Sequence, residues 1–152
     1  MYVALAAEFQ GFCRDLHDDT ATAMLWHVPP SIGPMVPIFL NSLTRGRQLD
    51  RGNAQPKSLG SDFQILGIQL WSDLATLRPG SKKRWHDTLD TLNDIRNAVA
   101  HSDQAKLDAL RKKEALDVRN WRRKRSALNQ LAIHMDKVAF NYLQTLTGAP
   151  PW

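Results

Sequence analysis

Three side chains that could do chemistry together stand near the middle of the chain: Arg96, Asn97 and His101. An imidazole can accept or donate a proton near neutral pH. A guanidinium offers a fork of N–H donors that matches phosphate oxygens. One histidine and one arginine are half of what metal-free cleavage of RNA needs. A second copy of the chain across a twofold axis would supply the other half, because such an axis duplicates every residue at the interface.

These side chains are expected on one helix over residues 81–101, with Ser81 as its cap. At about 100° per residue, one polar stripe of this helix holds His86, Asp90, Asn93, Asn97 and His101. The apolar stripe holds Trp85, Leu89, Leu92, Ile95 and Val99, with Arg96 within or beside it. The polar stripe could be no more than a solvated face. Arg96 must be paired, reach to solvent or face another chain.

Helical periodicity extends over nearly the whole chain. A first helix is expected over residues 2–26, with Leu5, Phe9, Phe12, Leu16 and Ala23 inward. The prolines of VPPSIGPMVP end it. A short helix over 36–43 and a polar loop over 44–60 are expected to follow.

A second long helix is expected from a cap at Ser61 or Asp62 to residue 77, and a short helix over 105–113 follows the third. The last long helix is expected over 117–146, ending at Gly148. Its inward residues would be Trp121, Leu128, Leu131, Met135, Val138, Tyr142 and Leu146. No segment alternates as a strand would. The sequence therefore predicts an all-α bundle of four long helices plus short extra helices, with one domain over 1–148 and a tail over 149–152.

Composition narrows the class of protein. With 43% hydrophobic and 23% charged residues the chain is globular rather than disordered. The net charge of +5 gives a mild attraction to polyanions. The only cysteine, Cys13, excludes an intrachain disulfide and fits a reducing cytoplasm, and its apolar surroundings predict an inert core residue. No apolar run approaches the roughly 20 residues that span a membrane, and the first residues do not form a secretory signal.

The motif Arg96-Asn97-Ala98-Val99-Ala100-His101 resembles the R-N-x-x-x-H signature of the HEPN superfamily. RWHDTLDTLNDI before it, VRNWRRKRSALNQLAIHMD at the start of the last helix and ALAAEFQGFCRDLHD in the first are similar to the RiboL-PSP type of HEPN domain. The resemblance covers about residues 2–146. It implies a helical bundle that pairs as a homodimer, with the two motifs facing each other across a cleft.

The resemblance also implies an activity: metal-independent endoribonuclease cleavage, found in toxins of toxin–antitoxin pairs and in phage defence. Arg96 would bind the scissile phosphate, and His101 would act as general base or acid for attack by the ribose 2′-hydroxyl, leaving a 2′,3′-cyclic phosphate. Asn97 would orient the histidine or the phosphate. Glu8 or Asp15 could serve as an acidic partner. RNA and an antitoxin protein would be the partners, and no cofactor is expected.

A basic run, Arg119 to Arg125, predicts a contact with RNA. The candidates are Arg119, Arg122, Arg123, Lys124 and Arg125. The helix dipole disfavours cations at a helix start, so phosphate contact or an acidic neighbour such as Asp117 must compensate. Lys82 and Lys83 begin the third helix, roughly 30 Å from His101 along its axis, where they could guide a longer strand.

Two alternatives remain open from the residues. The chain could be a non-catalytic HEPN module that binds nucleic acid or a protein, or a helical dimer whose polar stripe has no chemical role. A metal site is not expected, because the other histidines show no metal-ligand spacing: His17, His27, His86 and His134.

Overall fold

The computed structural model describes residues 1–152, and every regular element in it is helical. The α-helices are α1 (Tyr2–Leu25), α2 (Val36–Thr44), α3 (Gln48–Arg51), α4 (Pro56–Ile65), α5 (Leu70–Leu77), α6 (Lys82–Ala100), α7 (Gln104–Lys113) and α8 (Val118–Thr147). A 3-10 helix, η1 (Pro30–Met35), precedes α2. The prediction of an all-α chain is confirmed.

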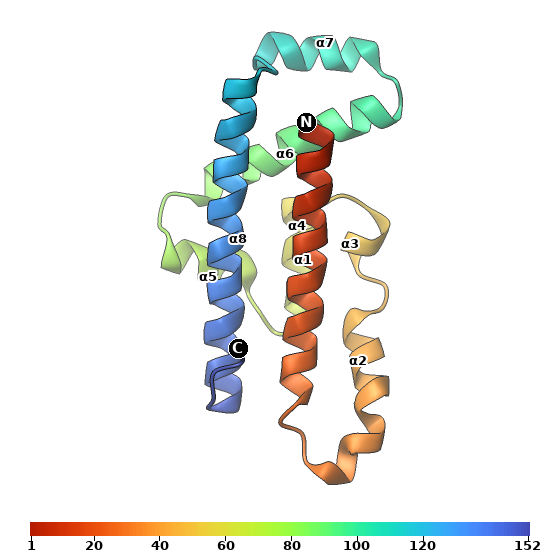
Figure 1. The fold of residues 1–152 in the computed structure, drawn as a ribbon, viewed down its shortest axis with the longest axis vertical. Helices are drawn as coiled ribbons and strands as arrows, with labels where there is room; N and C mark the ends of the chain where they lie inside the picture. The colour runs from red at the N-terminus through yellow and green to blue at the C-terminus, as the bar shows by residue number, and fades with distance from the viewer.

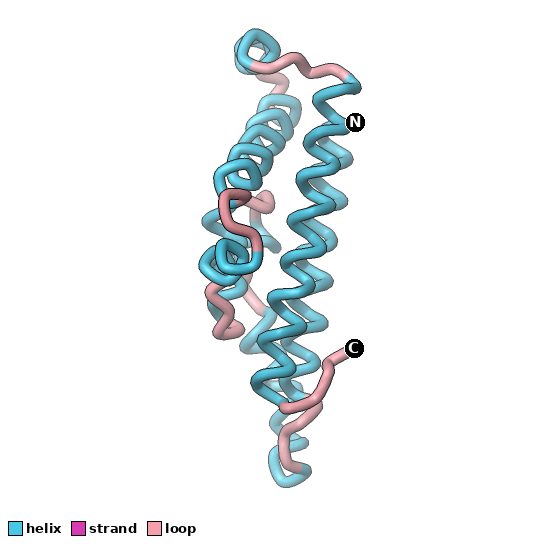
Figure 2. Tube along the Cα trace, turned by 90° about the vertical axis from the view of Figure 1, so that its left-hand side faces the viewer, coloured by secondary structure: helices cyan, strands magenta, loops and turns pink.

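The helices form two layers (Figures 1 and 2). α1 and α8 lie side by side in one layer and run in the same direction. α4, α5 and α6 form the other layer, in which α6 crosses behind α8 and α1. α7 lies across one end of the molecule and joins the end of α6 to the start of α8. α2 folds back along the lower half of α1, and α3 lies beside α1 at mid-height. Residues far apart in the sequence thereby meet around α1: the hydroxyl of Tyr2 donates to the carbonyl of Asp117, 115 positions away.

The core lies between these layers. Its largest fully buried side chains include Trp85 of α6, Phe63 of α4, and Leu131 and Met135 of α8. Cys13 of α1 is fully buried, and this burial raises the pKa of its thiol well above the ordinary value. The prediction that Cys13 is an inert core residue is therefore confirmed. No helix combines the length and the apolar character needed to cross a membrane.

The expected second long helix is split in two, and the prediction of four long helices is wrong. Gly67 stands between α4 and α5 with φ +86°, a left-handed conformation that ends α4. The N–H of Gly67 donates to the carbonyl of Gln64 (2.9 Å), and the N–H of Ile68 donates to that of Phe63 (3.1 Å). The apolar stripe continues across this break, because Leu66, Ile68 and Leu70 are all buried. Periodicity alone therefore could not show the turn.

Replacing Gly67 with alanine is expected to lower the free energy of unfolding by about 1–2 kcal/mol. A side chain is strained at this φ, and its Cβ would lie 2.5 Å from Oη of Tyr142, which must move. Gly11, inside α1, has open space around it, so Gly11→Ala should instead stabilise by about 0.5–1 kcal/mol. Urea unfolding of both variants checks the pair. Equal shifts would show that Gly67 has no special backbone role.

The segment expected as a polar loop over 44–60 is also more ordered than predicted. It contains α3 and the first half of α4, which begins with Pro56 at a position that needs no backbone N–H. Asp62 does not cap the helix that follows it. It lies inside α4, and its buried carboxylate accepts the backbone N–H groups of Gln48 (2.9 Å) and Leu49 (2.8 Å) at the start of α3. The cap thus acts across 13 residues of sequence.

Other helix ends follow the sequence more closely. Asp117 accepts the N–H of Asn120 at the start of α8, and Gly148 ends α8 with φ +75°. Ser81 stands at the start of α6 but makes no capping hydrogen bond through its side chain. Two residues expected inward are exposed, Val99 at 47% and Leu146 at 53%. Both lie in the final turn of their helices, beyond the packed layer; on α6 the inward position falls to Ala98.

The four residues after Gly148, expected to form a tail, contact the bundle. Pro151 is buried, and the centroid of the Trp152 ring lies 6.2 Å from the centroid of the Phe140 ring on α8. These contacts turn the end of the chain back along the last helix.

Candidate functional site

The R-N-x-x-x-H motif occupies the last turn and a half of α6. Arg96 and Asn97 are partly buried, whereas His101 is exposed at the position that closes the helix. The side chain of His101 makes no hydrogen bond or ion pair within the chain. The structure therefore holds the first two motif residues in place and leaves the imidazole free.

Arg96 contacts α1 through an amide rather than a carboxylate. Its Nη1 donates to Oε1 of Gln10 at 2.6 Å. Gln10 is buried, and its Nε2 donates to the carbonyls of Leu49 (2.7 Å) and Gly52 (2.6 Å). Glu8 and Asp15, the candidates for an acidic partner of the motif, are both exposed, and neither pairs with Arg96. A guanidinium has five N–H donors, so four remain available on Arg96.

The polar stripe of α6 is not simply a solvated face. The connection between α3 and α4 lies against it: Asn93 donates from Nδ2 to the carbonyl of Ala54 (3.1 Å), and Asn53 donates from Nδ2 to Oδ1 of Asn97 (2.9 Å). Further along the stripe, the ring of His86 packs edge-on against Trp71 (centroids 4.2 Å apart). These contacts hold the side chain of Asn97 against residue 53.

The backbone beside His101 is unusual. Ser102 has φ +53°, the left-handed conformation that normally selects glycine at a helix end. The N–H of Asp103 donates to the carbonyl of Ala98 (2.8 Å) and that of Ser102 to the carbonyl of Val99 (3.1 Å), which closes α6. Non-glycine residues in this conformation cost about 1 kcal/mol or more and cluster at functional sites.

A polar network around the buried Arg47 and His17 fixes α3, which in turn supplies the acceptors for Gln10. Arg47, only 7% exposed, pairs with Asp18 of α1 (2.5 Å) and with Asp50 (3.2 Å). Its Nη1 lies 3.3 Å from Nδ1 of His17, and Nε2 of this fully buried histidine donates to the carbonyl of Asp62 (3.0 Å). The sequence analysis did not predict these contacts of Arg47, because it assigned residues 44–60 to a polar loop.

This network predicts a pH dependence of stability. Burial, the largest cause, lowers the pKa of His17 below 6.5, and burial likewise lowers the pKa of His86. The unfolded chain therefore binds a proton at higher pH than the folded chain, and protons favour unfolding. From about pH 7 to about pH 5 the free energy of unfolding should fall, by at most ~1.4 kcal/mol per pH unit for each histidine. The slope should flatten in His17→Gln, whose amide keeps both hydrogen bonds without titrating, and remain in His27→Gln, where the histidine is exposed.

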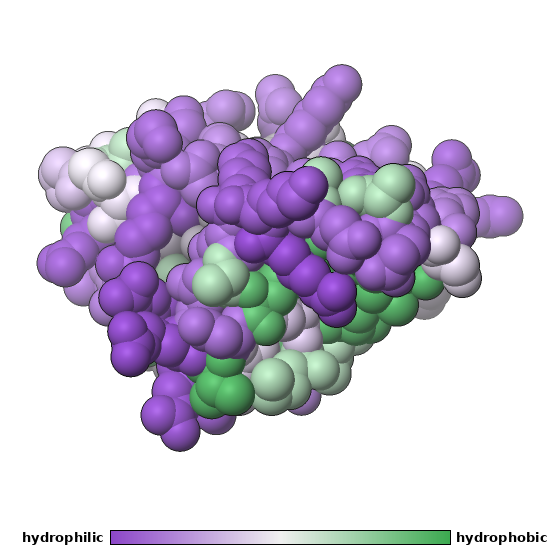
Figure 3. Space-filling view, turned by 90° about the horizontal axis from the view of Figure 1, so that it is seen from above, coloured by the Kyte–Doolittle hydropathy of each residue, from purple (hydrophilic) through white to green (hydrophobic).

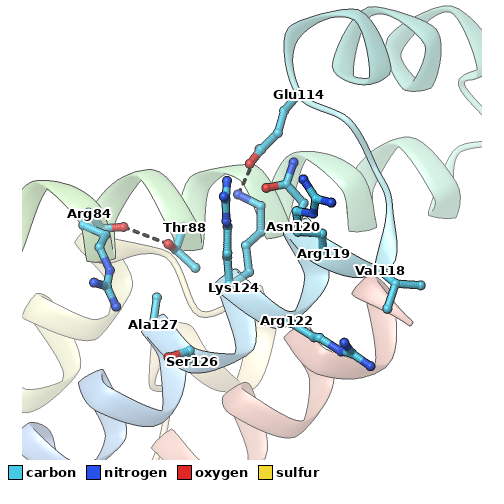
Figure 4. Close-up of a pocket in the computed structure, with 11 residues that line it drawn as sticks. Arg84, Thr88, Glu114, Val118, Arg119, Asn120, Arg122, Lys124, Ser126 and Ala127 are labelled. Atoms are coloured by element: carbon cyan, nitrogen blue, oxygen red, sulfur yellow. Dashed lines mark hydrogen bonds and ion pairs between the residues drawn. The ribbon is translucent and has the colours of Figure 1, made fainter.

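The basic run at the start of α8 divides into three environments. Arg119, Arg122 and Arg123 line an open cleft of about 850 Å³ between α6 and α8. Arg125 lies 5.5 Å from the centre of the Trp121 ring, over its face. Lys124 is 7% exposed and pairs through Nζ with Glu114 (2.9 Å), so it does not join the exposed cations. The remaining residues of the cleft are Arg84, Thr88, Glu114, Val118, Asn120, Ser126 and Ala127 (Figure 4).

Lys82 and Lys83 lie exposed in the first turn of α6, and Lys83 pairs with Asp87 (2.9 Å). The neighbouring Arg84 belongs to the cleft instead, where it meets the arginines of α8 and donates to Oε1 of Gln130 (2.8 Å). None of the motif residues lines this cleft. The structure thus separates the predicted site residues into two groups, one at each end of α6.

Gln10 and Asn53 are the motif's contacts that the sequence did not indicate. Gln10 follows Phe9 on the inward side of α1, and a polar residue at such a position is the only signal that could have marked it. No three histidine, cysteine or acidic side chains gather in an arrangement that could hold a metal ion. Comparison of the chain with protein-family models, with curated proteins and with solved structures finds no match.

Proposed function

We propose that the chain is an HEPN-type endoribonuclease that works as a homodimer, cleaves RNA without a metal ion and leaves a 2′,3′-cyclic phosphate. The observation that carries the proposal is the contrast between Arg96 and His101. Arg96 is held by Gln10 with four donors to spare, while His101, a little more than one turn further, is exposed and unpaired. A positioned phosphate binder and a free proton-transfer group at the same end of α6 are what this chemistry requires.

In this mechanism Arg96 binds the non-bridging oxygens of the scissile phosphate and stabilises the charge that grows on them. His101 takes the proton of the 2′-hydroxyl, and His101 of the second copy protonates the departing 5′-oxygen. Asn97, fixed by Asn53, orients the groups around the phosphate. The exposed Val99 in the same turn gives a partner copy an apolar contact next to the site. The left-handed Ser102 supports the assignment, because strained backbone gathers at such sites.

A second candidate function is a non-catalytic nucleic-acid-binding module. The cationic cleft between α6 and α8 favours it, because that cleft lies apart from the motif and needs no chemistry. A toxin or defence role, an antitoxin partner and a cytoplasmic location belong to the proposal only through the resemblance to HEPN domains.

Cleavage of an unstructured RNA by the purified protein in EDTA tests the proposal. Products that carry 2′,3′-cyclic phosphate ends by mass spectrometry, from a protein whose light-scattering mass is twice that of the chain, are the expected result. Intact RNA would favour the binding module. Products with 3′-hydroxyl ends would exclude attack by the 2′-hydroxyl.

A further inference from the structure

The positive charge of the chain is concentrated at one end of the molecule. Residues 104–125, which form α7 and the first turns of α8, hold nine basic and three acidic side chains. The net charge of this segment exceeds that of the whole chain, which is +5, so the remainder is slightly acidic. Seen from above, this end is covered mainly by hydrophilic side chains, with hydrophobic atoms confined to a smaller band (Figure 3). Any polyanion is therefore drawn to this end.

Two clefts of similar size open here, and their charges differ. The cleft between α6 and α8, about 850 Å³, has five basic side chains against Glu114 alone. The cleft between α6 and α7, about 870 Å³, has four basic and four acidic side chains. Only the first therefore carries a large surplus of positive charge. Lys124 lines both clefts, and its ion pair with Glu114 stands between them.

The pairing of Glu114 with Lys124 leaves four arginines of the first cleft without an acidic partner. Arg84 projects from α6, and Arg119, Arg122 and Arg123 project from α8. In Figure 4 Glu114 reaches down to Lys124, while the side chain of Arg122 points away from this ion pair. Only two of the eleven residues that line the cleft are hydrophobic.

We propose that this cleft binds the phosphodiester backbone of a single RNA strand. Arginine forks match phosphate oxygens, and the near absence of apolar lining argues against a protein partner, whose interface would need a desolvated apolar centre. The choice of RNA rests on the proposed function, because a strand anchored here would extend along α6 toward His101. Binding itself does not depend on cleavage, so it is tested separately.

The test measures the affinity of a fluorescent 20-nucleotide RNA for the full chain at about 0.1 M salt, in a His101→Ala background that leaves the RNA uncut. In one variant, three arginines of the cleft, Arg119, Arg122 and Arg123, are changed to glutamine. Each lost phosphate contact lowers the slope of log K against log salt by about 0.7, so three lost contacts should weaken binding about 100-fold at about 0.1 M salt. The slope of log K against log salt should fall by about 2. The matched control changes Arg45, Lys57 and Lys137 to glutamine, three exposed cations on other parts of the surface that make no ion pair.

The control should bind within about threefold of the parent, because the total charge changes equally in both variants while only one loses phosphate contacts. Equal weakening by the two triple variants would overturn the proposal, as would full binding by the cleft variant. Equally tight binding of a polyglutamate peptide would also overturn it, in favour of an acidic protein partner. Failure of the proposed function gives a different result: RNA stays intact when it is incubated with the wild-type protein in EDTA, whatever affinities the variants have for RNA.

Discussion

His101→Ala is expected to reduce RNA cleavage in EDTA by about 10²–10⁴-fold, the usual contribution of a general acid or base. The loss should occur without loss of stability, because the side chain is exposed and makes no hydrogen bond or ion pair that folding would miss. Single-turnover cleavage rates and urea unfolding of the same preparation measure the two effects. This separation is what distinguishes a chemical role from a structural one.

His27→Ala provides the matched control, since His27 is also an exposed histidine without a side-chain partner, at the far end of α1. Its cleavage rate should equal that of the wild type. Arg96→Lys should also lose cleavage, because an ammonium cannot reproduce the fork on the phosphate, although its charge is kept. Cleavage that survives both the His101 and the Arg96 substitutions would show that the activity arises elsewhere.

Asp62→Ala is expected to lower the free energy of unfolding by about 3 kcal/mol. The substitution removes the acceptor of two backbone N–H groups, of which that of Leu49 is fully buried and cannot turn to water. Alanine favours the interior of α4 by a few tenths of a kcal/mol, which offsets only a small part of the loss. α3 should loosen first, and with it the carbonyls of Leu49 and Gly52 that hold Gln10.

Hydrogen exchange locates this effect: the amides of Gln48 and Leu49 should lose protection more than those of α8. Asp15→Ala is the control, because Asp15 lies exposed on α1 with no hydrogen bond, and its unfolding free energy should change by less than about 0.5 kcal/mol. An equal, small shift in both variants would mean that the carboxylate of Asp62 does not hold α3.

Local patterns predicted the long helices with clear ends. The first helix was expected over 2–26 and is Tyr2–Leu25, and the last was expected over 117–146 and is Val118–Thr147. The first succeeds because its apolar stripe runs into a proline-rich segment. The last succeeds because an apolar stripe, a capping aspartate and a terminal glycine all lie close in sequence. The sequence did not predict the break at Gly67, because the φ of one residue decides it while the apolar stripe around it continues unchanged. The helical structure within residues 44–60 was also not predicted, because its main stabiliser, Asp62, acts from another helix.

The candidate site shows the same limit. The spacing of Arg96, Asn97 and His101 placed all three at the end of α6, where they lie. Their partners depend on tertiary contacts, so no spacing rule could name Gln10, which is 86 positions from Arg96. Likewise the sequence shows the basic run at the start of α8. It does not show that Lys124 is buried, because this depends on its ion pair with Glu114.

The burial of Cys13 has a practical consequence. Because this thiol is the only one in the chain and has no exposed surface, a thiol reagent can react with it only in molecules whose bundle has opened. The alkylation rate of native protein therefore measures how often the layers separate, with no engineered probe, and RNA that ties α6 to α8 should slow that reaction.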